Sequence, residues 1–189
     1  MYYGNIKRSD IANGEGIRTT LFVSGCRNYC KNCFNPETWN FTYGNPFTEE
    51  VEEYIFSTFQ NPVLAGLTIL GGEPMEPENQ QALLPFLRRF KERFPEKTIW
   101  LFTGNLYEEL TGASGTHPKC LPITSEILAL VDILVDGRFE EEKKSIGIRF
   151  RGSTNQRIID MNKTRQSGEI VIWEGCKEDR YYEGPKEYL

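Results

Sequence analysis

Three cysteines within eight residues constrain this chain more than any other feature of its sequence. They are Cys26, Cys30 and Cys33. A strand-like run, residues 19–24, comes before them, and Gly25 supplies a turn between the run and the first cysteine. A loop of this kind can bring three thiols to one inorganic centre. On a cubane iron–sulfur cluster three thiolates leave one iron open, so the cluster can act as a reaction site as well as an electron carrier.

A zinc site and a disulfide framework are the alternatives for these thiols. Structural zinc accepts four thiolates, or three thiolates and an imidazole, and the distant Cys120, Cys176 or His117 could complete such a set. Zinc ligands are usually spaced two by two, which favours the cluster instead. The five cysteines are an odd number, and no charged and apolar leader opens the chain. We therefore expect a reducing, cytoplasmic setting and no secreted disulfide framework.

The cysteine spacing, CxxxCxxC, resembles the cluster motif of radical S-adenosylmethionine (SAM) enzymes. A second motif strengthens this resemblance. Gly71-Gly72-Glu73-Pro74 follows the apolar run 67–70 and is similar to the segment that holds the methionyl amino group of SAM in that superfamily. Glycine suits a backbone that must approach a ligand closely, because it has no Cβ. Without the cysteines, an ordinary strand-to-helix turn would be the simpler interpretation of the two glycines.

Two further segments resemble one branch of that superfamily, the enzymes that activate glycyl-radical enzymes. Residues 13–18, Asn-Gly-Glu-Gly-Ile-Arg, are similar to the NGxGxR segment of this branch, although a hairpin or loop is the simpler interpretation. Residues 151–157, Arg-Gly-Ser-Thr-Asn-Gln-Arg, are similar to the RGSxNQR segment of the proteins that activate anaerobic ribonucleoside-triphosphate reductases. A tryptophan commonly stands where this chain has Phe150, so an aromatic side chain is preserved.

The resemblance implies roles for residues in each motif. The three cysteines would bind the metal cluster and take part in catalysis. Phe34 would shield the cluster near the adenine, and Asn35 would hydrogen-bond SAM, whereas Trp39 is predicted to be a core residue. The residues expected to bind SAM are Phe34, Asn35, Gly71, Gly72, Glu73, Thr103, Asp136, Arg151 and Ser153.

Three of these assignments have simple alternatives. Asp136 follows a buried run and could cap a loop, but the ends of strands form the active face of a strand–helix barrel. Arg151 and Ser153, together with Asn155 and Arg157, could belong to a solvated loop, or could bind the SAM carboxylate or ribose or the partner's glycine loop.

The activity implied by the resemblance is radical chemistry on a protein partner. A [4Fe-4S] cluster would bind SAM, one electron from a flavodoxin- or ferredoxin-type donor would cleave it, and the resulting 5′-deoxyadenosyl radical would abstract hydrogen from a glycine of the anaerobic ribonucleoside-triphosphate reductase. The alternatives are an activating enzyme of the formate-lyase type, a small iron–sulfur electron carrier and a zinc-stabilised binding module. The RGSTNQR segment and the absence of a ferredoxin-like cysteine insert argue against the first.

Composition excludes two classes of partner. A net charge of −5 and a pI near 5.1 argue against tight, nonspecific binding of nucleic acid. No apolar run approaches the ~20 residues of a membrane span, so no membrane partner is expected.

Strands alternating with helices over the first 136 residues predict an α/β fold with a parallel sheet. A complete eight-fold barrel needs about 250 residues, and this chain of 189 residues is therefore expected to form an incomplete, TIM-like barrel of the radical SAM type. We expect one domain over residues 1–189, with an irregular tail from about 175.

The pattern also predicts individual elements. Strands are expected at residues 67–70, 98–102, 131–137 and 169–173, the last joined to Ile159 by a hairpin. Helices are expected from Thr48, from Pro77 with a kink or a later start at Pro85, over 106–110 and over 124–130. The turn-rich stretch 111–122 is predicted to be an inserted loop with a solvated histidine.

Overall fold

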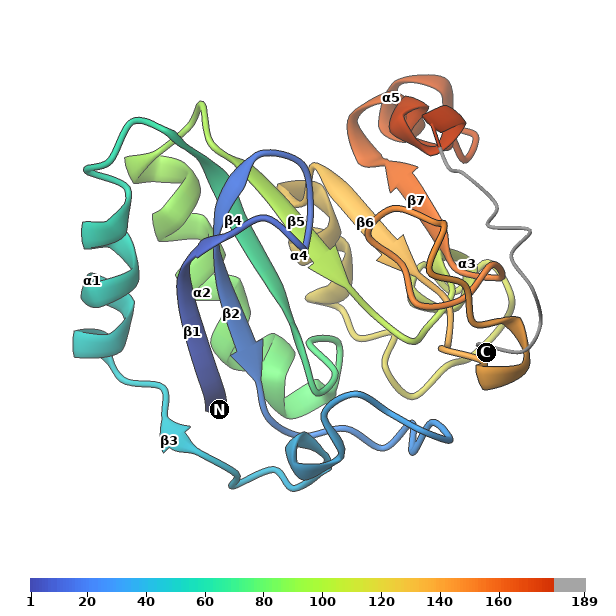
Figure 1. The fold of residues 1–189 in the computed structure, drawn as a ribbon, viewed down its shortest axis with the longest axis horizontal. Coiled ribbons are helices and arrows are strands. Elements are labelled where there is room, and N and C mark those ends of the chain that lie inside the picture. Colours follow the sequence, from blue (N-terminus) through green and yellow to red (C-terminus); the bar gives the residue numbers. More distant parts are fainter. Residues whose placement is uncertain (179–189) are drawn as a thin grey trace.

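Four parallel strands form the centre of the fold in the computed structural model, which describes residues 1–178. Each pairs with the next in parallel, and parallel neighbours require crossover connections, which here contain helices (Figure 1). The predicted α/β class is therefore confirmed. The four strands are β2 Ile17–Val23, β4 Leu64–Gly71, β5 Thr98–Phe102 and β6 Ile133–Asp136.

Antiparallel strands extend the parallel centre on both sides. On one side β1 pairs with β2 and β3 pairs with β1, and on the other side β7 pairs with β6. The sheet order is β3-β1-β2-β4-β5-β6-β7, so within the described part of the chain β3 and β7 are the edges of an open sheet. The segment between β1 and β2 is a hairpin connection, as the simpler interpretation of residues 13–18 predicted. The antiparallel strands are β1 Tyr2–Asp10, β3 Asn45–Pro46 and β7 Arg157–Asp160.

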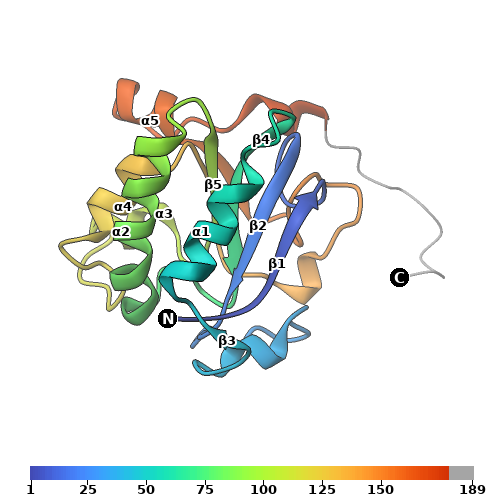
Figure 2. The same ribbon diagram turned by 90° about the vertical axis from the view of Figure 1, so that its left-hand side faces the viewer.

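The longer helices cover one face of this sheet, as Figure 2 shows. Alternate strand residues therefore point into two different cores. Ile99 and Leu101 pack toward the helices, whereas Trp100 packs on the opposite face with Val135 and Ile158. Segments 137–156 and 170–176 help to cover that opposite face. The helices are α1 Glu49–Thr58, α2 Pro77–Arg93, α3 Tyr107–Leu110, α4 Thr124–Leu130 and α5 Met161–Ser167, and the 3-10 helices are η1 Pro36–Trp39, η2 Glu141–Lys143 and η3 Glu174–Glu178.

Most predicted elements are present, and the C-terminal part differs. Helix α2 begins at Pro77 and continues through Pro85. The predicted strand at 169–173 is wrong: only Ile172 pairs, in an isolated antiparallel bridge to Ile159. The link between them is no simple hairpin, because Asp160 caps α5 by accepting from the Lys163 backbone N–H.

The region beyond α5 bears on two further expectations. The tail predicted from about residue 175 begins within η3, and its remainder lies outside the described residues. Within residues 1–178, no helix combines the length and apolar character needed to cross a bilayer.

Arg18, the arginine of the NGEGIR segment, joins three parts of the sheet from the face opposite the helices. Only 1% of it is exposed, and its Nε donates to Thr68 Oγ1 at 2.8 Å. Its Nη2 donates to the carbonyls of Leu67 and Thr98 at 2.9 and 2.8 Å, and its guanidinium lies 5.6 Å from the Trp100 ring centroid. Burial lowers the pKa of Arg18 to about 10, so the side chain is still charged at neutral pH.

We predict that Arg18→Met destabilises the fold strongly, because two buried carbonyls lose a charged donor. The cost should be about 3 kcal/mol for unsatisfied buried acceptors. In a chain of this size that lowers the unfolding midpoint by roughly 6–12 °C. Thermal unfolding followed by circular dichroism on the anaerobically reconstituted protein measures the shift.

Arg88→Met is the matched control. Arg88 pairs with Glu126, and 53% of its side chain is exposed, so its loss should cost no more than about 1 kcal/mol. Equal midpoints for the two variants would contradict the role assigned to Arg18.

Candidate active site

A cavity of about 640 Å³ opens at the carboxyl ends of the parallel strands. Leu70 and Gly71 at the end of β4, Phe102 at the end of β5 and Gly137 after β6 line it. The cysteine loop, residues 26–33, lines one part of the cavity, and residues between 139 and 152 line another. The volume lies within the range of small-molecule sites in proteins. Ligands of open α/β sheets bind at this end of the strands.

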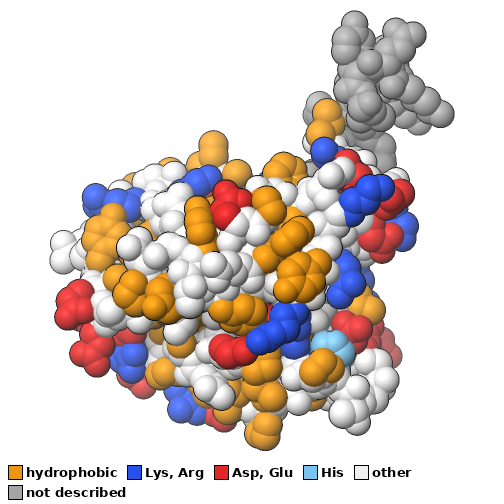
Figure 3. All heavy atoms as spheres, turned by 90° about the horizontal axis from the view of Figure 1, so that it is seen from below, with side chains coloured by type: hydrophobic (Ala, Val, Ile, Leu, Met, Phe, Trp, Pro, Cys, Tyr) orange, Lys and Arg blue, Asp and Glu red, His pale blue; other side chains and the backbone are white. Residues whose placement is uncertain are grey.

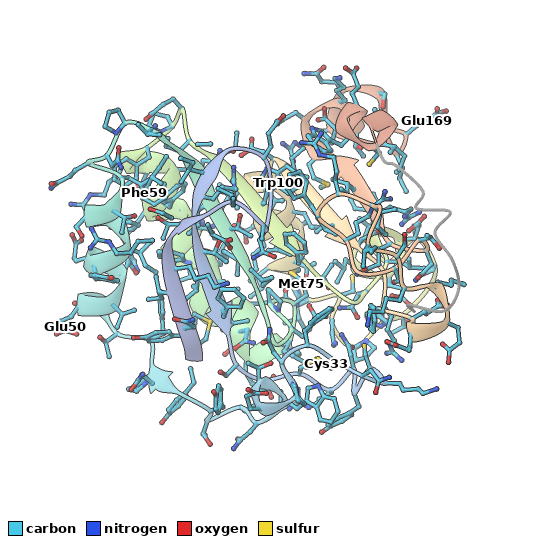
Figure 4. The ribbon with its side chains drawn as sticks, viewed as in Figure 1. Cys33, Glu50, Phe59, Met75, Trp100 and Glu169 are labelled. Atoms are coloured by element: carbon cyan, nitrogen blue, oxygen red, sulfur yellow. The ribbon has the colours of Figure 1, made fainter. Side chains whose placement is uncertain are left out.

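All three motif cysteines line this cavity. Cys26 is buried, whereas Cys30 and Cys33 are half-buried. Tyr29 and Asn32 hold the intervening chain in the left-handed region, with φ of 48° and 56°. Such a backbone is uncommon for residues other than glycine and is concentrated at functional sites. The loop therefore turns sharply between the cysteines and presents all of them to one space; Figure 4 shows Cys33 at this lower end of the molecule.

The environments of Cys26 and Cys30 favour the neutral form of these two thiols. Burial raises the pKa of Cys26 to about 11, although the Asn28 backbone N–H, 3.4 Å from Cys26 Sγ, lowers it. Burial also raises the pKa of Cys30, against the opposing charge of Arg138. A bound metal ion or cluster requires thiolates, so its binding would release protons from this site.

Two backbone hydrogen bonds fasten the glycine motif to the start of the cysteine loop. Gly72 N donates to Val23 O at 2.7 Å, and Glu73 N donates to Gly25 O at 2.8 Å. Gly71 has a φ of +113°, and a Cβ there would lie 2.7 Å from Val23 O; a Cβ on Gly72 would lie 2.7 Å from Gly25 O. The two glycines are therefore required by close packing of the chain against itself, at the rim of the cavity that they line.

Glu73 does not line the cavity but lies behind it, fully buried. Its Oε1 accepts from Met75 N at 2.9 Å and from Thr103 Oγ1 at 2.8 Å. Its Oε2 accepts from Asn28 Nδ2 at 2.8 Å and from Gly104 N at 2.9 Å. One carboxylate thus joins the glycine motif, the cysteine loop and the end of β5.

Asp136 and Ser153 also lie outside the cavity lining. Asp136 is fully buried, accepts from Tyr107 N at 2.8 Å and forms an ion pair with Arg157. Arg157 also donates to Glu108 at 2.7 Å, which holds α3 against β6 and β7. The buried Ser153 Oγ accepts from Glu140 N at 3.2 Å and so fixes the wall segment.

The structure therefore divides the sequence-predicted residues into two groups. One group lines the common cavity: Cys26, Cys30, Cys33, Phe34, Asn35, Gly71, Gly72, Thr103 and Arg151. The other group, Glu73, Asp136 and Ser153, is buried beside it and holds its walls. Trp39, which we expected in the core, lies on the cavity wall with its ring 5.2 Å from that of Tyr29.

Sequence reasoning missed much of the apolar wall. Phe139, Ile146, Ile148 and Phe102 line the cavity together with Phe150, and Asn28 and Gln156 contribute amides. The RGSTNQR segment pointed to this region, since Phe150 directly precedes the segment and Gln156 belongs to it. Nothing in the spacing of Phe139 or Ile146 distinguishes a cavity wall from an ordinary loop.

The arrangement of the thiols suits a cluster. A cubane offers a separate iron to each thiolate, and so needs its ligands around a common space. Three cysteines around one cavity meet that requirement.

Comparisons with known proteins agree with this geometry. Residues 12–159 match the family described as a 4Fe-4S single cluster domain. The anaerobic ribonucleoside-triphosphate reductase-activating protein of Pasteurella multocida is 40% identical over 160 residues, which cover 84% of this chain and 96% of that protein. The proteins of the same name from Vibrio cholerae and phage T4 are 38% and 37% identical, over 84% of this chain and 97% and 93% of their own lengths. The chain belongs to the family of anaerobic ribonucleoside-triphosphate reductase-activating proteins.

Proposed function

We propose that this protein activates an anaerobic ribonucleoside-triphosphate reductase by radical SAM chemistry at the cavity described above. The observation that carries the proposal is that the three motif cysteines and the GGEP motif, which are distant in sequence, line or support one 640 Å³ cavity. A [4Fe-4S] cluster held there by Cys26, Cys30 and Cys33 would pass one electron from an external donor to SAM, for cleavage to methionine and a 5′-deoxyadenosyl radical that would take a hydrogen atom from a glycine of the reductase.

The residues of this chain would bind and orient the reactants. Cys26, Cys30 and Cys33 would hold the cluster. Asn35 and Arg151 would present polar groups to SAM along the cavity wall, and the backbone of Gly71 and Gly72 lies at its rim. Thr103 also lines the cavity, but its hydroxyl donates to Glu73. Glu73, Asp136 and Ser153 are buried behind the cavity wall and would fix the segments that carry these groups.

Apolar side chains would keep water away from a reactive alkyl radical. Phe102, Phe139 and Phe150 line the interior of the cavity. Such exclusion prevents side reactions, and close contact with the target removes the entropic cost of bringing two reactants together. Hydrogen-atom transfer needs no acid–base pair, so the site needs no histidine.

The mouth of the cavity suits a protein substrate. Phe34 and Ile146 both line the cavity and are each 76% exposed. Figure 3 shows hydrophobic side chains gathered on this lower end of the molecule. An apolar rim around an open cavity fits an inserted polypeptide loop that carries the target glycine.

The remaining expectations belong to the same proposal. The open seven-stranded sheet, with its site at the carboxyl ends of parallel strands, supports an incomplete barrel of the radical SAM type within one domain over residues 1–189. A flavodoxin- or ferredoxin-type protein would donate the electron. The odd number of cysteines, five, suits the reducing cytoplasm.

We predict that Cys30→Ala abolishes glycyl-radical formation, because a cluster ligand is lost. The measurement is the electron paramagnetic resonance spectrum of the anaerobically reconstituted, reduced protein mixed with SAM and the reductase. The wild-type mixture should give a glycyl doublet and the variant none. Cys120→Ala is the matched control, since this thiol lies outside the cavity lining, and it should preserve the doublet.

Two results would contradict parts of the proposal. SAM cleavage by an intact cluster without a glycyl doublet would retain the radical chemistry and reject the reductase as substrate. A cluster that neither binds nor cleaves SAM would favour an electron carrier.

We predict that Asn35→Ala weakens SAM binding and leaves cluster content unchanged. The loss of one hydrogen bond, worth about 1 kcal/mol, corresponds to a roughly fivefold higher Kd. Anaerobic equilibrium dialysis with SAM measures the Kd, and an iron assay measures the cluster. Asn5→Ala, an exposed position on β1, is the control and should bind SAM as the wild type does. Equal affinities for the two variants would remove Asn35 from the binding site.

A further inference from the structure

The loop at residues 111–122, predicted to be a mere insertion, places a lysine beneath the cysteine loop. Lys119 is 6% exposed, and its Nζ lies 3.0 Å from Asn28 Oδ1 and 3.0 Å from Glu76 Oε1. Its own carbonyl accepts from Gln80 Nε2 at 2.8 Å. The backbone of the loop is thus tied to α2, and the side chain spans from there to the cysteines.

Lys119 balances two buried carboxylates. Glu73 and Glu76 are 0% and 1% exposed, and such groups are costly unless a charge or hydrogen bonds compensate them. Arg27 pairs with Glu76 at 2.7 Å from the outer side. Glu73 accepts from neutral donors, and Lys119 Nζ is the cation placed near it, at 3.9 Å.

Asn28 connects this lysine to a cysteine of the motif. Its side-chain oxygen accepts from Lys119, and its Nδ2 donates to Glu73 Oε2 at 2.8 Å. Its backbone N–H donates to Cys26 Sγ at 3.4 Å. The direction of that N–H therefore depends on the Asn28 side chain, which Lys119 and Glu73 hold by hydrogen bonds to its oxygen and its nitrogen.

We propose that Lys119 is a positioning residue that raises the reduction potential of the cluster held by the three motif cysteines. The inference rests on the proposed function, because it requires that cluster. Hydrogen bonds to the sulfurs, net charge and exposure set the potential of an iron–sulfur cluster. A nearby cation favours the reduced, more negative state, and a fixed N–H directed at Cys26 Sγ does the same. Both effects make the cluster easier for its donor to reduce.

The test is an anaerobic redox titration of the reconstituted protein, followed by electron paramagnetic resonance without the reductase. Lys119→Met keeps the length of the side chain and removes its charge and its donors. The equilibrium constant for reduction should fall roughly tenfold, which for a one-electron couple is a potential about 59 mV more negative. Lys163→Met is the control, because this lysine lies on α5 outside the cavity lining, 47% of its side chain is exposed and it pairs with Glu174. Its potential should equal that of the wild type.

A second variant decides the case in which Lys119→Met fails to take up a cluster. Asn28→Ala leaves Lys119 paired with Glu76 and removes its direct hydrogen bond to the cysteine loop. It should also lower the potential. If Lys119→Met has full cluster content and the reduction potential of the wild type, the inference is wrong. If Lys119→Met holds no cluster, a wild-type potential in Asn28→Ala overturns the inference instead.

The outcomes separate this inference from the proposed function. Wild-type protein that holds no cluster, or holds one that SAM does not affect, would reject the proposed function itself. A wild-type protein with an intact, SAM-responsive cluster and variants of unchanged potential would reject the role of Lys119 alone. If Lys119 had only a structural role, Lys119→Met would lower the unfolding temperature and leave the reduction potential of the cluster unchanged.

Discussion

The hydrogen bonds from Gly72 N to Val23 O and from Glu73 N to Gly25 O are the contacts on which the site depends. They join the end of β4 to the turn that starts the cysteine loop, although the two segments are about fifty residues apart in sequence. The rest of the site follows from this junction. Once it is formed, the Glu73 carboxylate reaches Asn28 on one side and Thr103 on the other, so the cysteines are fixed relative to both strand ends. A catalytic loop gains precision when rigid elements hold it in this way.

Buried polar groups on the sheet are satisfied by partners from distant segments. Arg18 bonds to carbonyls of β4 and β5, and Asp136 pairs with Arg157. Each such group costs little while its partners are present and several kcal/mol when one is removed. Both faces of the sheet carry such groups. Arg18 lies on the face opposite the helices, whereas Asp136 lies on the helix side, where it accepts from Tyr107 N of α3. These bonds specify one arrangement of the chain around the cavity.

The sequence predicted some features well because they depend on local signals. The strand at residues 98–102 has the expected bounds, the next helix begins at Pro77, which was one of the two starts expected, and the cysteine and glycine motifs do lie together. Other features depend on contacts that no local pattern records. An acid at a strand end can face a cavity or a neighbouring arginine, and residue type does not distinguish the two for Asp136. The short helix α5 was missed because its start signal is the single capping residue Asp160.

The charges near the cysteine loop explain why an inserted loop can matter for chemistry. Two carboxylates, Glu73 and Glu76, are needed as acceptors to hold the cysteine loop, yet their negative charge opposes the addition of an electron close by. Arg27 offsets one of them from the solvent side, where water and salt screen its effect. Lys119 reaches both acids from the buried side, where screening is weak. A fold that anchors its cluster loop with acids therefore needs a buried cation, and here the loop at 111–122 provides it.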